Sequence, residues 1–164
     1  MSSGGEEYRR RIVTYMETKK INKDISFERI CNELPHQYLE LKEWDKLYDF
    51  LLDFEVFDYI YKKNEYELGK YWRTLQKENK EKYSLEKFLE LDVNDKSQET
   101  IWGYYHGIGS FASNLLTDYA LSIDIHQKAL AMHEKAFGMN QKTFAGFEKV
   151  GLAILLMLQN RIDT

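Results

Sequence analysis

The feature that most constrains the fold is a repeat in the last third of the sequence. Between residues 99 and 160, Ile108-Gly109 aligns with Val150-Gly151 and Tyr105 aligns with Phe147, so that Gly109 and Gly151 mark an offset of 42 residues. Small residues let helices approach closely. In both copies of the repeat they stand at matching positions, with bulky residues on either side. A period in this range is typical of a solenoid of helical pairs. The sequence therefore predicts an all-α array of antiparallel helical hairpins.

The repeat predicts three consecutive helices, at about 99–117, 119–137 and 140–160. Gly138 follows the second of these and should end it, because glycine readily adopts the left-handed conformation that closes many helices.

The composition favours helical structure along the whole chain and excludes some classes of binding partner. The 164 residues include one proline and nine glycines, and the net charge is −4 with mixed signs. This charge argues against a nucleic acid or an anionic membrane surface as partner. The longest apolar run, 150–158, is too short to cross a bilayer, so membrane insertion is not expected. A single cysteine, Cys31, excludes an internal disulfide and favours a reducing compartment such as the cytoplasm.

We expect three regions along the chain: a leader and first helix at 1–25, a helical linker domain at 26–96, and repeats at 97–164. Within the linker domain, Ser26 can cap the start of a helix. Pro35 either kinks that helix or begins a new one at its first turn. The segment 44–61 predicts short amphipathic helices packed as hairpins. A further helix at about 65–76 should bury Trp72.

The string ALAMHEKAFG, residues 129–138, resembles the tetratricopeptide repeat of the kinesin-light-chain type. It is followed by Thr143 and a Val-Gly-Leu core, as in that family. Two departures are that Asn140-Gln141 stand where the family has His-Pro, and that Ser122 and His126 replace a small and an aromatic residue. The resemblance implies a TPR-like α-solenoid.

The front half resembles the segment that follows the NTPase module in nephrocystin-three and related proteins. The matching positions are Glu33-Leu34-Pro35, Leu39, Trp44, Leu47, Phe57, Glu67-Leu68 and Tyr71-Trp72. Proteins of this type place a signalling NTPase, this linker and kinesin-type repeats in that order. The resemblance implies a signalling scaffold in the cytoplasm or at the cilium. The chain has no phosphate-binding loop of the Gly-x-x-x-x-Gly-Lys-Ser/Thr type, so nucleotide binding is not expected.

Small polar residues on the first predicted helix of the repeat suggest a binding groove. They leave room for an extended peptide and offer hydrogen-bonding groups to its backbone. The alternative is that they simply face solvent. The candidate peptide-binding residues of both repeat copies are His106, Ser110, Ser113, Asn114, Glu148, Lys149 and Leu152. The expected partner is thus a protein or peptide, and the expected role is that of a scaffold or adaptor.

A second interpretation is a regulatory fragment of a STAND-type NTPase that packs against a nucleotide-binding module.

The segment 150–158 is apolar nearly all round, which suggests that the chain is part of a longer repeat protein, or that this helix is buried by folding back or by self-association. An enzyme is the least expected class, because no nucleophile, base and orienting group can be assembled from the sequence.

Three other groups of residues could suggest metal binding or reactivity, but we favour structural or surface roles for them. His126 and His133 share a helix face, but zinc needs three or four ligands, so we expect packing or surface roles and no metal. Asp45, Asp49 and Asp53 form a solvated stripe rather than a calcium loop. Cys31 lies in an apolar stripe and should be a small buried residue. No cofactor is expected.

Overall fold

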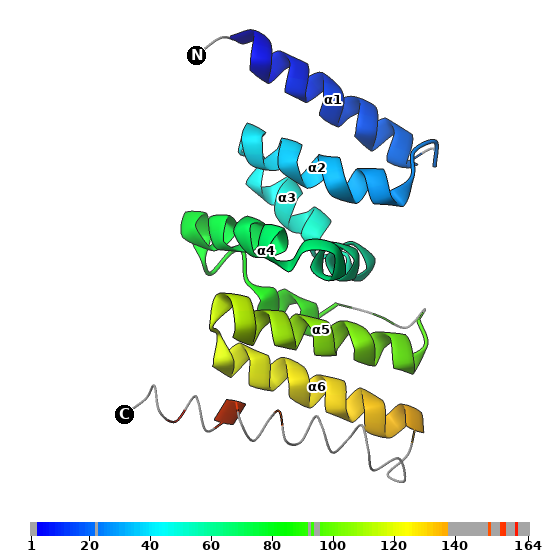
Figure 1. The fold of residues 1–164 in the computed structure, drawn as a ribbon, viewed down its shortest axis with the longest axis vertical. Helices are drawn as coiled ribbons and strands as arrows, with labels where there is room; N and C mark the ends of the chain where they lie inside the picture. The colour runs from blue at the N-terminus through cyan, green and yellow to red at the C-terminus, as the bar shows by residue number, and fades with distance from the viewer. Residues whose placement is uncertain are drawn as a thin grey trace. The chain divides into compact units, whose positions relative to one another are not determined.

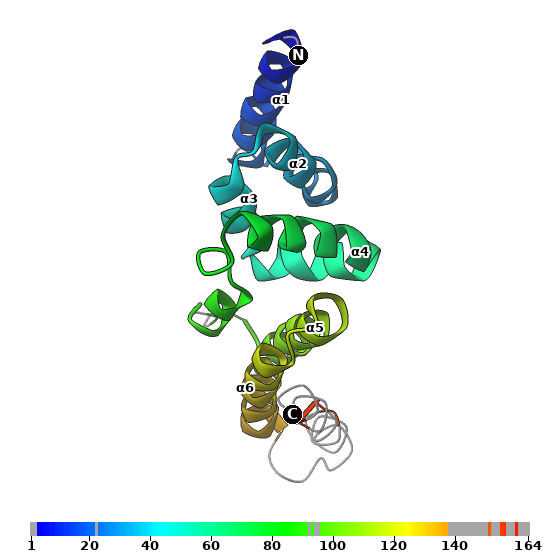
Figure 2. The ribbon, with the colours of Figure 1, turned by 90° about the vertical axis from the view of Figure 1, so that its left-hand side faces the viewer.

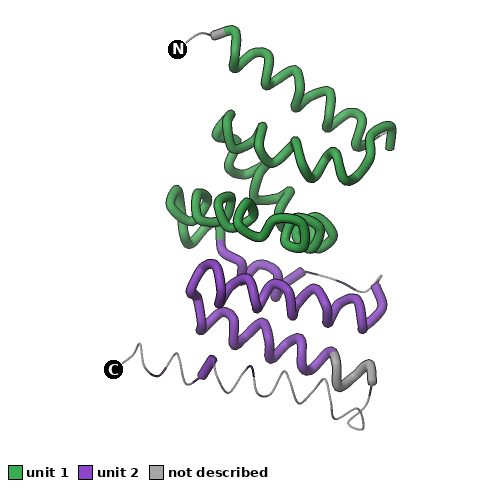
Figure 3. The backbone as a smooth tube through the Cα atoms, in the orientation of Figure 1, with its two compact units in different colours: residues 1–83 green, residues 84–164 purple. Residues whose placement is uncertain are grey.

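The computed structural model describes residues 3–21, 23–91, 93, 96–137, 151, 155, 156 and 160, without the side chains of 3 and 133–137. Every regular element among them is helical, which confirms the predicted all-α class (Figure 1). The chain divides into two compact units, unit 1 at 1–83 and unit 2 at 84–164 (Figure 3). The divisions predicted at 25–26 and 96–97 stay predictions.

Unit 1 is built from four helices in succession (Figures 1 and 2). They are α1 (Ser3–Ile21), α2 (Phe27–Leu41), α3 (Trp44–Leu51) and α4 (Phe54–Asn79). Apolar residues at spacings of three and four turn inward and form the core, as amphipathic helices require. Trp72 is fully buried, as predicted. The core also includes Met16, Leu34, Leu47, Leu51, Phe57, Leu68, Tyr71 and Leu75.

Side-chain caps explain where two of these helices begin. The Ser26 hydroxyl accepts a hydrogen bond from the Arg29 amide at 3.3 Å, which confirms the predicted cap of α2. The Asp53 carboxylate accepts from the amides of Glu55 and Val56 at the start of α4. The helix α2 runs through Pro35, so this proline does not open a new helix.

The helix α4 is interrupted at Asn64, whose backbone is extended with φ −157° and ψ 84°. The Asn64 side-chain oxygen accepts from the Glu67 amide at 3.2 Å and so caps the second half. This interruption falls between the predicted segments 44–61 and 65–76.

Unit 2 contains the 3₁₀ helix η1 (Leu85–Leu89) and the helices α5 (Gln98–Leu116) and α6 (Tyr119–Phe137). The helices α5 and α6 lie side by side along their length (Figures 1 and 2). Their bounds agree with the predicted helices 99–117 and 119–137 to within one residue. Most of the predicted helix 140–160 lies outside the described residues, and so does Gly138, the predicted end of the helix 119–137.

Side chains from both long helices hold η1 in place. The Tyr105 hydroxyl donates to the Phe88 carbonyl at 3.1 Å. Lys128 donates to the Leu89 carbonyl, and its ammonium lies 4.8 Å from the centre of the Tyr105 ring. Polar groups at the end of the 3₁₀ helix are thereby satisfied inside the unit.

Candidate functional site

A hollow in unit 2 lies beside α5 and α6 and coincides with sequence-predicted residues. Its volume of about 510 Å³ falls in the usual range for ligand sites. The described residues that line it are His106, Ser110, Ser113, Asn114, Thr117, Tyr119, His126, Gly151 and Leu155. We refer to this hollow as the α5–α6 cavity. All four candidates from the first repeat copy line it.

Helical geometry brings the α5 residues together. His106, Ser110, Ser113 and Asn114 follow one another at spacings of one, three and four, so they share one face of the helix, and Thr117 follows in the turn after it. Ser113 is buried, Ser110 is half-buried, and His106 and Asn114 are exposed. The cavity therefore has an inner surface of small hydroxyl residues and a polar, accessible rim.

A close contact between the two helices fixes the position of His126. A methyl group on Gly109 would lie only 2.3 Å from Nδ1 of this ring, so the imidazole occupies the space that glycine leaves. His126 is 5% exposed, and its Nδ1 lies 2.8 Å from the Ser122 carbonyl. The Ser122 hydroxyl in turn donates to the Gly109 carbonyl at 2.8 Å. His126 is thus part of the contact between α5 and α6.

Aromatic contacts connect His106 to this arrangement. Its ring stacks on Trp102, with centres 5.6 Å apart and an interplanar angle of 27°. The same ring meets His126 edge to face at 5.5 Å. Two imidazoles from different helices therefore border the cavity in a defined geometry.

Five of the described lining residues were not among the sequence-predicted site candidates: Thr117, Tyr119, His126, Gly151 and Leu155. His126, which stands where the repeat that the sequence resembles has an aromatic residue, was the available signal. Glu148, Lys149 and Leu152, the candidates from the second repeat copy, lie outside the described residues.

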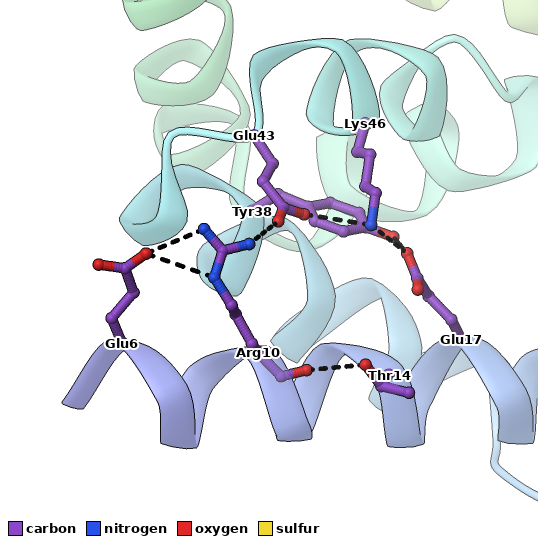
Figure 4. A network of polar contacts seen from close by, with 7 residues as sticks. All are labelled: Glu6, Arg10, Thr14, Glu17, Tyr38, Glu43 and Lys46. Carbon is purple, nitrogen blue, oxygen red and sulfur yellow. Dashed lines mark hydrogen bonds and ion pairs between the residues drawn. The ribbon is translucent and has the colours of Figure 1, made fainter. Parts of the chain in front are cut away.

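A second polar cluster lies in unit 1, where α1 meets the elements after it (Figure 4). Arg10 bridges Glu6 and Glu43 at 2.9 and 2.8 Å, and Lys46 lies 3.2 Å from both Glu43 and Glu17. The Tyr38 hydroxyl donates to Glu17 at 2.9 Å; burial, followed by this bond, raises the pKa of Tyr38. These contacts hold α1 against its neighbours.

The remaining sequence candidates take structural positions. Asp53 caps α4, and Asp45 accepts a hydrogen bond from the Tyr83 hydroxyl at 2.7 Å. Cys31 is buried, and burial raises the pKa of its thiol to about 12. Within the described part of the chain, no group of three or more histidine, cysteine, aspartate or glutamate side chains is placed to hold a metal. The side chain of His133 is outside the described residues.

No protein-family model, curated protein or solved structure matches the chain. Among the described helices, none combines the length and apolar character needed to cross a membrane.

Proposed function

We propose that this protein is a non-catalytic interaction module that binds a short peptide segment of a protein partner in the α5–α6 cavity. In this proposal α5 and α6 act as one hairpin of a TPR-like array. One observation carries the proposal: four residues chosen for small polar character on one helix face border a single cavity.

The composition of the cavity supports this role. Small side chains on α5 leave space, and the hydroxyl and amide groups of Ser110 and Asn114 suit the backbone of an extended peptide. Leu155 and Tyr119 add apolar surface that an apolar side chain of the peptide can cover. This mixture of apolar lining and a few polar groups is typical of ligand-binding sites.

The proposal is tested by selecting binders from a random peptide library displayed on phage, with the full chain as the target. Synthetic copies of the enriched peptides are then measured by fluorescence anisotropy. Asn114→Ala should weaken them by about 3-fold to 10-fold, because an exposed hydrogen-bonding group is lost from the rim.

The matched control is Gln127→Ala. Gln127 is an exposed amide residue on α6 that is not among the described lining residues. Both variants should keep the wild-type circular dichroism spectrum. Equal affinities for wild type and Asn114→Ala, or an equal loss in both variants, would remove the cavity from the proposal.

A further inference from the structure

One side of α4 in unit 1 carries a row of cationic residues. Tyr66, Lys70, Arg73, Lys77 and Lys80 follow one another at spacings of four, three, four and three residues, so they lie along one side of the helix. All five residues are exposed, and Lys80 at the C-cap keeps helical dihedral angles, with φ −64° and ψ −39°. We refer to this side of the helix as the Tyr66–Lys80 face.

The glutamates of this part of α4 lie away from the Tyr66–Lys80 face. With 3.6 residues per turn, the three lysines of the face lie within about 40° of Tyr66 around the helix axis. On the same count Glu65, Glu67 and Glu78 lie about 100° to 120° from Tyr66. The next acidic residue, Glu81, comes after the C-cap of the helix. The row of cations is therefore not interrupted by a glutamate of α4.

The ammonium groups of this face are not neutralised by nearby carboxylates. Lys62, which precedes the interruption of α4, forms an ion pair with Asp58 at 2.7 Å. In contrast, Lys70, Lys77 and Lys80 make no ion pair with any residue that the structure describes. These three ammonium groups can therefore pair with carboxylates of another molecule.

Helix stability accounts for only part of this pattern. Cations in the last turn of a helix offset its dipole, which explains Lys77 and Lys80. The dipole does not explain Lys70, which lies about two turns before Lys77, or Tyr66, which is 70% exposed. Tyrosine is enriched in protein interfaces because it offers a large apolar ring with a polar tip. The composition of the face thus suits the surface of a partner protein.

Spacing and charge favour an acidic helix as the occupant. Carboxylate residues three and four positions apart on a helix have Cβ atoms about 5–6 Å apart, which matches the spacing of cations on this face. The whole chain has a net charge of −4, which opposes the long phosphate backbone of a nucleic acid. A short helix with carboxylates on one side meets the local cations with less of this repulsion.

We propose that the Tyr66–Lys80 face binds an acidic amphipathic helix of a partner protein. Carboxylates at spacings of three and four residues pair with Lys70, Lys77 and Lys80, and an apolar side chain at the end of that row covers the Tyr66 ring. The face is about 21 Å long, so the partner helix needs about 15 residues. This inference goes beyond the proposed function, because it concerns unit 1 and does not depend on the α5–α6 cavity.

Two fluorescein-labelled peptides of about 20 residues test the inference on the full chain by fluorescence anisotropy. The first is an alanine–glutamine helix with glutamates at spacings of three and four residues and a leucine at each end of that row. The second has the same composition and helicity, but its glutamates are distributed around the helix. At low salt, where exposed charges are least screened, the first peptide should bind at least about 5-fold more tightly.

Two triple variants identify the cations that bind. One replaces the lysines of the face: Lys70→Gln, Lys77→Gln and Lys80→Gln. It should weaken binding of the first peptide by about 3-fold to 30-fold, because each exposed ion pair contributes little by itself. The control variant has the same change in net charge and replaces three exposed lysines outside α4: Lys20→Gln, Lys23→Gln and Lys42→Gln. It should leave the affinity nearly unchanged, and both variants should keep the wild-type circular dichroism spectrum.

Tighter binding of the one-sided peptide, lost in the first variant and kept in the control variant, supports the inference. No binding, equal binding of the two peptides, or an equal loss in both variants overturns it. An oligothymidine of equal charge provides the comparison with nucleic acid. If the oligothymidine binds more tightly than the one-sided peptide and the first variant weakens it, the face belongs to a nucleic acid and the inference is likewise overturned.

Discussion

At the scale of single residues, Gly109 determines how closely α5 and α6 approach. An added Cβ would lie 2.3 to 3.1 Å from three atoms of the His126 ring, so this buried ring would have to move from its hydrogen bond with the Ser122 carbonyl. Gly109→Ala should therefore lower the free energy of unfolding by about 1–3 kcal/mol. Urea denaturation followed by circular dichroism measures the change.

Gly103→Ala is the matched control, since it lies on the same helix and an added Cβ meets nothing within 4 Å. Alanine is the better helix former, so this variant should gain about 0.5–1 kcal/mol. Equal effects at both positions would contradict the close contact.

Thr117 provides a second prediction at this scale, because its backbone is left-handed with φ 55° and ψ 26°. A left-handed conformation costs a residue with a side chain roughly 1–2 kcal/mol, and glycine avoids this cost. Thr117→Gly should raise the free energy of unfolding by about 1 kcal/mol, seen as a higher melting temperature of unit 2 signals. A lower melting temperature would show that the threonine hydroxyl stabilises the turn by more than its backbone conformation costs.

At the scale of elements, the interruption of α4 gives a prediction for unit 1. The Asn64 side chain caps the second half of the helix through the Glu67 amide. Asn64→Ala should lower the free energy of unfolding by about 1 kcal/mol, whereas Asn64→Asp retains an acceptor and should lose less. If Asn64→Ala were the more stable variant, the two halves would favour one continuous helix.

Most helices were predictable from the sequence, whereas the effect of a proline inside a helix was not. Apolar spacing gave both bounds of α5 and α6 closely, and Ser26 marked the start of α2. Pro35 was ambiguous because a proline can lie inside a helix when packing compensates for the lost hydrogen bond.

Only the part of the site that α5 contributes was predictable from the sequence. Residues on the same face of α5 follow from helical periodicity, so His106, Ser110, Ser113 and Asn114 could be grouped. Thr117, Tyr119 and His126 depend on how α6 turns back and packs, which requires the contact between Gly109 and His126. The sequence marks Gly109 as a small residue and His126 as a departure from the resembled repeat, but it does not show that the two residues meet.

At the scale of the whole molecule, buried groups predict a loss of stability in alkali. Burial raises the pKa of the Cys31 thiol from 9.0 to about 12, and burial also raises the pKa values of Tyr38 and Tyr71. Between the two pKa values the folded state holds a proton that the unfolded state has released. The stabilising contribution is therefore complete below about pH 9 and is lost as pH rises toward 12.

Urea denaturation at a series of pH values from neutrality to pH 10 should show a declining free energy of unfolding above pH 9. Cys31→Ala removes the thiol titration, so its decline should be shallower than that of the wild type. A wild-type stability that increases with pH in this window would contradict the burial of these groups.

The central claim is that peptides bind in the α5–α6 cavity, and mapping by ¹H–¹⁵N NMR tests it most directly. A peptide from the displayed library is titrated into the full chain, and the amide shifts are plotted along the sequence. We expect the largest changes between His106 and Tyr119 and at His126, the residues that border the cavity. Changes confined to α1–α4, with α5 and α6 unaffected, would contradict the claim.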